Sequence, residues 1–202
     1  AGYADQFITV DLVDKQELSG LLVQLIPLQL GGTVSAATGG TVTLMGSTAQ
    51  VIISPNSLKR ADGQAIQGNV SVSFALINTA QEIRNMPGDL STQINNVRSP
   101  LESFGAMIVD LRDSTGAKVE LIANQLANIR IPLMARGTPP STIPLYYFDS
   151  QRGDWLQDGT RVLTLQSDTN GNRFYTGSST TLDTVNADIP YQTTNVTGCL
   201  AE

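Results

Sequence analysis

The sequence contains no histidine and only one cysteine, Cys199, among its 202 residues. Histidine is the commonest general base near neutral pH and the commonest transition-metal ligand, so its absence excludes Ser-His-Asp and Cys-His catalysis. A zinc site would have to be built from carboxylates alone, which is unusual. We therefore expect a protein that is not an enzyme and that carries no cofactor.

Charged and aromatic residues are also scarce, at 15% and 5% of the chain. The 12 basic and 18 acidic residues give a net charge of -6, which disfavours binding to a phosphate backbone. The apolar runs are shorter than the roughly 20 residues that a membrane helix needs. The sequence thus predicts no nucleic-acid partner and no membrane insertion by this chain, which we expect to be a fragment of a longer protein.

The hydrophobic residues, 41% of the chain, follow the two-residue period of β-strands. Residues 70–76 and 127–131 each alternate apolar with small or polar residues, as half-buried strands do. Residues 42–44 and 51–53 predict the two arms of a hairpin. Residues 104–111 are apolar on both faces, which predicts a central strand covered on both sides.

Two further segments carry weaker signals. Leu18–Leu25 is apolar, and we prefer a strand there because Gly20 does not favour a helix. Glu82–Asn96 is polar with few strand formers, so we expect a long loop on the surface. Ion pairs should hold this loop, formed by the charged residues around it: Arg84, Asp89, Arg98 and Glu102.

The clearest breakpoint is Ala135–Thr142, where one glycine and two prolines separate strand-like segments. Beyond it, residues 145–148, 154–156, 161–165 and 172–176 predict a short meander. The sequence therefore predicts an all-β fold. It consists of a Greek-key-like β-sandwich over residues 1–135, with an N-terminal extension, and a smaller packed β unit over residues 136–202.

The predicted hairpin Tyr146–Trp155 holds much of the aromatic content of the chain. One interpretation is a stacking platform for a sugar ring, formed by Tyr146, Tyr147 and Trp155. The other is a hairpin whose alternate aromatic side chains fill the core, with Trp155 facing the partner strand. We favour the core interpretation.

The segment Asp168–Asn172 carries three side chains of the kind that bind calcium: Asp168, Asn170 and Asn172. An EF-hand loop has glycine at its sixth position and glutamate at its twelfth. Here glycine is fourth and the twelfth residue is Ser179. Because Asn-Gly is a strong hairpin signal, a plain turn is the better interpretation, and a looser metal site is the alternative.

Five aspartates are candidates for the carboxylate pair of a glycoside hydrolase: Asp110, Asp113, Asp149, Asp154 and Asp158. Most of them stand beside glycine or arginine in predicted turns, where aspartate commonly accepts hydrogen bonds from its own backbone. We therefore expect no acid/base pair among them.

Three longer blocks occur in order along the chain: MPGDL at 86–90, PLESFGAMIVDLRDSTG at 100–116 and IPLYYFDSQRGDW at 143–155. Together they resemble the extracellular β-sandwich region of the cartilage intermediate layer protein family and of related bacterial surface proteins. The opening GGTV, followed by VIISPNSL, is also similar to the β-sandwich of ankyrins and netrin receptors. The likeness covers residues 33–199, with Tyr146 where relatives tend to have tryptophan.

The resemblance implies a structural or adhesion module within a larger protein that is extracellular, at the cell surface or periplasmic. Its partner would be another protein or a surface glycan. The alternative function is a carbohydrate-binding module that uses the aromatic hairpin and a calcium-stabilised turn. For a structural or adhesion module we expect these residues to have structural roles. Met86–Asp89 would hold the long loop in place, residues 104–109 would form the central strand, and Trp155 would close the second unit.

The same resemblance bears on two features near the C-terminal end, Cys199 and the segment around Asn186. Cys199 is either a stray thiol or half of a disulfide to a residue outside the fragment, and the point at which relatives enter a following domain supports the disulfide. Some distant relatives cleave themselves at a His-Phe-Ser-like sequence before an Asn-x-Asp segment. Here Asn186-Ala187-Asp188 is present, but residues 181–184 contain no histidine to activate a hydroxyl, so self-cleavage is not expected. Glycosylation triplets begin at Asn69 and Asn195.

Overall fold

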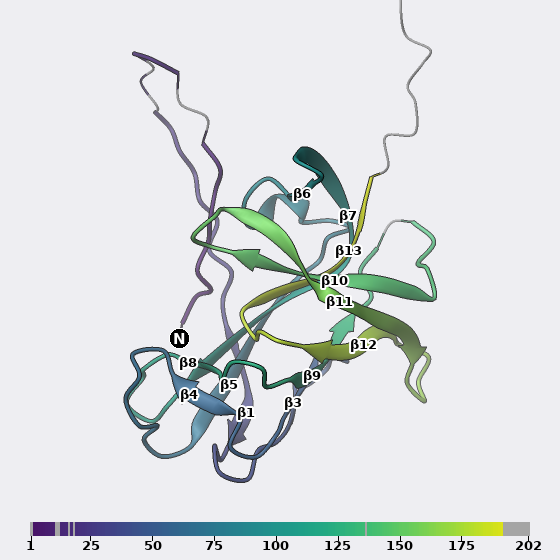
Figure 1. Ribbon diagram of the computed structural model, residues 1–202. Coiled ribbons are helices and arrows are strands. Elements are labelled where there is room, and N and C mark those ends of the chain that lie inside the picture. Colours follow the sequence, from purple (N-terminus) through teal and green to yellow (C-terminus); the bar gives the residue numbers. More distant parts are fainter. Residues whose placement is uncertain (1, 11–12, 16, 18, 136, 192–202) are drawn as a thin grey trace, which may run out of the picture.

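Figure 1 shows the computed structural model of the chain, which describes residues 2–191 except 11, 12, 16, 18 and 136. Cys199 and the glycosylation triplet at Asn195 lie outside the described residues. Within them the only helix is the short 3-10 helix η1 (Ile83–Asn85). The strands are β1 (Gln29–Val34), β2 (Gly40–Thr43), β3 (Gln50–Ile53), β4 (Leu58–Arg60), β5 (Val70–Ile77), β6 (Ser91–Ile94), β7 (Val97–Arg112), β8 (Val119–Leu121), β9 (Ala127–Pro132), β10 (Thr142–Asp149), β11 (Asp154–Ser167), β12 (Arg173–Ser179) and β13 (Thr184–Pro190). The prediction of an all-β chain is confirmed.

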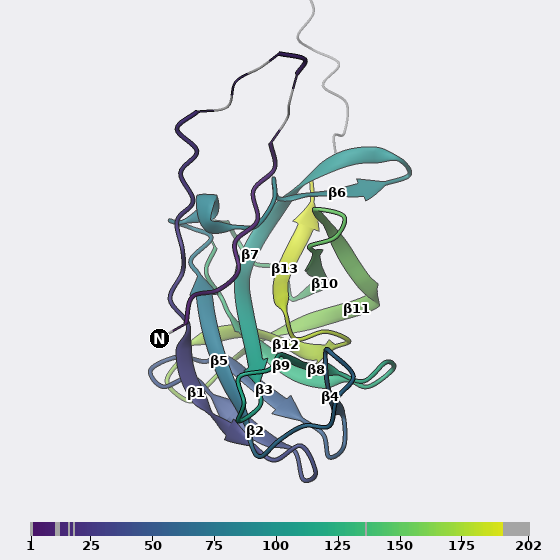
Figure 2. The same ribbon diagram turned by 90° about the vertical axis from the view of Figure 1, so that its left-hand side faces the viewer.

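In this described part of the chain, eleven strands form one antiparallel sheet in the order β1-β5-β7-β13-β10-β11-β12-β9-β3-β2, with β6 paired to β7. β4 and β8 form a separate two-stranded ladder. A tight turn joins the two ends of the path, β1 and β2, and in it the Gly39 amide donates to the Ser35 carbonyl oxygen at 2.8 Å. The sheet therefore curls into a nearly closed, sandwich- or barrel-like structure (Figures 1 and 2).

The boundary expected near residue 136 does not divide this sheet. Strands β10 to β13 lie between β7 and β9, because β13 pairs with β7 and β12 pairs with β9. Without these partners β7 and β9 would each present an unpaired edge of backbone N–H and C=O groups. The strands after the Pro-Gly connection thus complete the main sheet rather than form a sheet of their own.

Most of the strands predicted from alternation are present, but two segments differ. The strand expected at Leu18–Leu25 is wrong: residues 19–25 form no ladder, and Leu18 lies outside the described residues. The apolar residues of 21–25 lie exposed on an extended segment that pairs with no strand. The surface loop expected at 82–96 is in part ordered structure, since it contains η1, strand β6 and the buried Met86.

Two hydrophobic cores lie on opposite faces of the central strands. From β7, Met107 and Val109 enter the main core, whereas Ala106 and Ile108 enter the second core. Strands β5 and β10 alternate in the same way. A central strand that is buried on both faces reads as a continuous apolar run, as the sequence of residues 104–111 predicted.

Candidate functional site

Trp155 is the centre of the second core. Its side chain is fully buried, its ring packs edge-on against Phe148 at 5.5 Å between centroids, and its Nε1 donates to the Pro87 carbonyl oxygen at 3.0 Å. Tyr146 is buried on the same side, whereas Tyr147 points to the other face and is half-buried. Because two of the three proposed rings are buried, this hairpin offers no stacking platform to a sugar.

The loop at Met86–Asp89 is attached to the same core, where the sequence placed its anchor. Met86 is buried, and the Gly88 amide donates to the Phe7 carbonyl oxygen at 2.9 Å. Gly88 has φ +68°, and a Cβ there would lie 2.8 Å from the Phe148 ring, so only glycine fits. Of the expected ion pairs in the described residues, Arg98 pairs with Asp89, while Arg84 and Glu102 form none.

The Asp168 turn has the geometry of a capped hairpin. Asp168 Oδ1 accepts hydrogen bonds from the backbone N–H groups of Asn170 and Asn172, both at 2.8 Å, and Oδ2 accepts one from Asn172 Nδ2 at 2.9 Å. These bonds, the one from the Asn172 side chain first, lower the pKa of Asp168. Among the described residues no group of three or more His, Cys, Asp or Glu side chains is placed to hold a metal ion. Both carboxylate oxygens of Asp168 already accept hydrogen bonds from within the turn.

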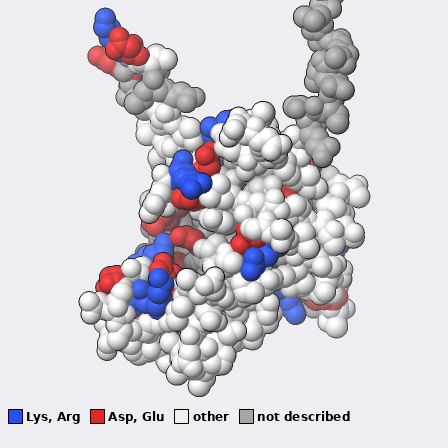
Figure 3. All heavy atoms as spheres, in the orientation of Figure 1, with Lys and Arg blue, Asp and Glu red and all other residues white. Residues whose placement is uncertain are grey.

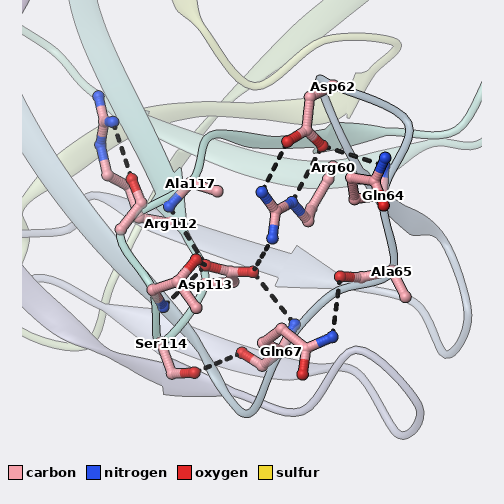
Figure 4. Close-up of polar contacts among 11 residues, drawn as sticks. Arg60, Asp62, Gln64, Ala65, Gln67, Arg112, Asp113, Ser114 and Ala117 are labelled. Atoms are coloured by element: carbon pink, nitrogen blue, oxygen red, sulfur yellow. Dashed lines mark hydrogen bonds and ion pairs between the residues drawn. The ribbon is translucent and has the colours of Figure 1, made fainter.

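Asp113 is the most heavily bonded carboxylate of the described chain (Figure 4). Its oxygens are buried and accept hydrogen bonds from Thr115 Oγ1 at 2.7 Å and from the backbone N–H groups of Thr115, Ala117 and Gln67. Arg60 completes the cluster with an ion pair at 3.3 Å. The hydrogen bonds, led by that of the Thr115 hydroxyl, lower the pKa of Asp113 to about 2. The cluster ties the loop after β4 to the turn after β7, and its role is structural.

Replacing Asp113 with asparagine should make the protein less stable at neutral pH and less sensitive to acid. A carboxyl whose pKa is lowered by folding contributes stability above its unfolded-state pKa, about 3.9, and loses it as the pH falls through about 2. The gap in unfolding midpoint between wild type and Asp113→Asn should therefore narrow between pH 4 and pH 2, measured by circular dichroism. Asp62→Asn, which alters the exposed partner of Arg60, is the matched control with a smaller expected effect. A gap that stays constant with pH would contradict this account.

The remaining candidate carboxylates also serve turns and ion pairs. Asp110 pairs with Arg112 at 2.8 Å, and Asp149 accepts from the backbone of the turn that follows it. Asp154 lies 3.8 Å from Arg98. Asp158 is buried and accepts from the Thr180 hydroxyl at 2.6 Å. Each carboxylate thus has a partner in the protein. Among them only Asp149 caps the turn that follows it, as turn chemistry predicts, whereas Asp154 and Asp158 lie in β11 and find their partners on distant segments.

A buried polar cluster between β7 and β13 was missed as a site by sequence reasoning. Ser103 Oγ donates to Asn186 Oδ1 at 2.6 Å, and Asn186 Nδ2 donates to Asp188 Oδ2 at 2.6 Å. Asp188 and Asn186 are fully buried, and Asp188 Oδ1 has no hydrogen-bond partner among the described residues. Burial raises the pKa of Asp188 well above its ordinary value, and the Ser103 hydroxyl offsets this only in part. The signal available in the sequence was an Asn-x-Asp pair within an apolar strand.

This cluster sits at a β-bulge. The register between β7 and β13 shifts between the pairs Asn186–Ala106 and Asp188–Ser103, so that two residues of β7 oppose one of β13. Gly105 lies in the bulge with φ +148°, and a Cβ there would collide with the carbonyl oxygen of Pro132. Glycine at this position lets the end of β9 approach β7 closely.

The most exposed apolar segment of the described chain is an N-terminal arm, formed by the described residues between 8 and 25 (8–10, 13–15, 17 and 19–25). Hydrogen bonds between Ala4 and Ile26 and between Gly2 and Leu28 close its base, and Phe7 packs against Phe148 at 5.3 Å between ring centroids. Beyond this base both views show the arm projecting away from the sheet (Figures 1 and 2). Its exposed apolar side chains are Ile8, Val13, Leu21, Leu22, Val23 and Leu25.

Charged side chains are sparse on the face shown in Figure 3, and most of those visible lie beside a charge of opposite sign. This agrees with the ion pairs of Arg60, Arg98 and Arg112, each with an aspartate. This face of the molecule therefore offers neither a basic patch nor a strong acidic one.

A scan against protein-family models and searches of the curated proteins and of the solved structures find no match to this chain. The family resemblance of the three sequence blocks stays a prediction. The described residues contain no helix with the length and hydropathy that a membrane crossing requires.

Proposed function

We propose that this chain is a non-enzymatic structural or adhesion module of a larger extracellular, cell-surface or periplasmic protein, and that it binds a protein partner through the N-terminal arm. The observation that carries the proposal is the contrast between the arm and the rest of the molecule. The sheet buries most of its large apolar side chains in two cores and exposes others only at scattered positions, whereas the arm leaves a run of leucine and valine side chains in solvent, and Leu22 is 90% exposed. Exposed apolar patches of this kind mark interaction sites.

The anchoring of the arm supports the same proposal. Ala4 is buried in the second core and Phe7 packs against that core, so the base is fixed to the sheet while the rest of the arm stands clear of it. A fixed base reduces the entropy that is lost when the apolar part of the arm binds. The five aspartates considered for a carboxylate pair support a role without catalysis, because each is held by hydrogen bonds or an ion pair within the fold.

Photo-crosslinking in the intact parent protein tests this proposal. A photoreactive amino acid at Leu22 should give a discrete adduct with one partner protein, whereas the same amino acid at Met45 should give none. The two positions are matched, because Met45 is 93% exposed and lies on the turn between β2 and β3. The combined change of Leu21, Leu22 and Leu25 to serine should abolish binding to that partner while shifting the free energy of unfolding by no more than about 0.5 kcal/mol per site. No adduct at Leu22, or equal adducts at both positions, would refute the role of the arm.

A further inference from the structure

A polar face runs across β11, β12, β9 and β3, which are neighbours in the sheet (Figure 1). The register places Thr164 opposite Thr176, Thr176 opposite Arg130, and Arg130 opposite Gln50. Gln50 Nε2 extends the row to β2 by donating to Thr43 Oγ1 at 2.8 Å. Alternation makes these side chains point outward, since residues between them, such as Ile129 and Tyr175, belong to the main core. Hydroxyl, amide and guanidinium groups thus form a continuous row over five strands.

This row lines an open hollow of about 330 Å³. Asn128 on β9 and Gln166 on β11 add two carboxamides to its walls. Within the described residues, four of the lining side chains have no hydrogen-bond or ion-pair partner in the protein: Asn128, Arg130, Thr164 and Gln166. A set of donors and acceptors that the fold leaves unused is available to a ligand.

Arg130 gives the hollow its charge. Its guanidinium lies 4.8 Å from the centroid of the Phe174 ring, a cation–π contact that holds the side chain flat against the sheet and covers the buried ring. Arg60, Arg98 and Arg112 each pair with an aspartate, but no carboxylate of the described residues lies within ion-pair distance of Arg130. Although the chain has a net charge of -6, this half-buried guanidinium is held in place and unpaired, so it is available to a carboxylate of a ligand.

We propose that this polar face binds a glycan chain that carries carboxylate groups, a uronate polysaccharide, with Arg130 as the carboxylate partner. Sugar hydroxyls both donate and accept hydrogen bonds, as the Asn, Gln and Thr side chains of the face do. The backbone groups beneath are already paired in the sheet, so a peptide cannot add as a further strand. A single unpaired arginine is too little positive charge for a nucleic acid.

The site differs from an aromatic platform in how it recognises its ligand. Phe174 is covered by Arg130 and Trp155 is buried in the second core, so stacking contributes nothing here. Hydrogen bonds and one charge pair determine the affinity, which makes binding sensitive to salt. The proposal is independent of the arm, because the hollow and the arm share no residue.

Affinity electrophoresis and calorimetry with defined polymers test the proposal. The probes are polygalacturonate, alginate and hyaluronate as uronate chains, dextran and cellohexaose as neutral glycans, and polyglutamate as an anionic polypeptide, all in the presence of EDTA. We expect retention by at least one uronate chain and by neither neutral glycan. Arg130→Gln should weaken that binding on the order of tenfold or more. Arg84→Gln removes the same charge from η1, outside the hollow, and should leave binding unchanged.

Three binding results with the wild-type protein would overturn the proposal. They are no binding to any of the uronate chains, equal binding to the neutral glycans, and binding to polyglutamate as tight as to the uronates. An equal loss of affinity in Arg84→Gln would show attraction by total charge alone and would also overturn it. Unfolding midpoints of both variants confirm that they are folded, and Asn128→Ala provides a second, uncharged variant that should weaken binding by a smaller factor.

Discussion

Replacing Trp155 with alanine is expected to lower the free energy of unfolding by about 3–5 kcal/mol. The side chain is fully buried between Phe148 and the Pro87 loop, so its removal leaves a cavity in the second core. A typical domain has a total stability of about 5–15 kcal/mol, so the variant should be largely unfolded near physiological temperature. Denaturant titration followed by circular dichroism measures the loss.

The variant Trp155→Phe separates packing from hydrogen bonding. It keeps an aromatic ring but loses the Nε1 donor to the Pro87 carbonyl oxygen, at an expected cost of about 1–3 kcal/mol. A Trp155→Ala protein that keeps its wild-type midpoint would contradict the core assignment. If it instead lost glycan binding in an intact fold, the platform interpretation of the hairpin would return.

Replacing Asp188 with asparagine is expected to stabilise the protein at neutral and alkaline pH. Folding raises the pKa of this buried carboxyl, so the stability that depends on its protonated form is complete below the unfolded-state pKa, about 3.9. That stability declines as the pH rises further and is lost once the pH passes the raised value in the fold. Each unit by which folding raises the pKa of Asp188 corresponds to about 1.4 kcal/mol of unfolding free energy that is lost at high pH. Asparagine stays neutral and can still accept a hydrogen bond from Asn186, so it removes this decline.

Unfolding midpoints between pH 4 and pH 9 check the prediction. The unfolding midpoint of Asp188→Asn should increasingly exceed that of the wild type as the pH rises. Tyr146 is the titratable group that senses this charge, since burial and Asp188 both raise its pKa. Asp183→Asn is the matched control on the same end of the chain, because Asp183 is exposed and pairs with Lys118 at the surface. Equal pH slopes for wild type and Asp188→Asn would show that the buried carboxyl imposes no cost.

The strands themselves were largely predictable from local pattern. The alternation at residues 70–76 and 127–131 and the apolar run at 104–111 correspond to β5, β9 and β7, since burial of one or both faces dictates the residue types along a strand. The Asp168 turn was also predictable, because its Asn-Gly and aspartate act within a few residues of each other. The apolar arm was not, since exposure and burial of a leucine run look the same in the sequence.

The candidate sites depended on strand pairing across the chain. The row from Gln50 to Thr164 joins four strands from both halves of the sequence, and the Ser103–Asn186–Asp188 cluster joins residues more than eighty positions apart. No local spacing brings such residues together. The bulge at Gly105 is defined only by the pairing of β7 with β13, and the need for glycine there only by the approach of Pro132 at the end of β9.

By itself the sequence determined the all-β class, the absence of histidine chemistry, the acidic balance and most strand positions, because composition and two-residue periodicity act locally. The tertiary structure decided that residues on either side of 136 share one sheet, that Trp155 lies in a core, and that Arg130 faces solvent beside unused amides and hydroxyls. These outcomes depend on which strands find each other as partners. Pairing is settled by long-range backbone hydrogen bonding and by closure of the sheet, which no single segment encodes.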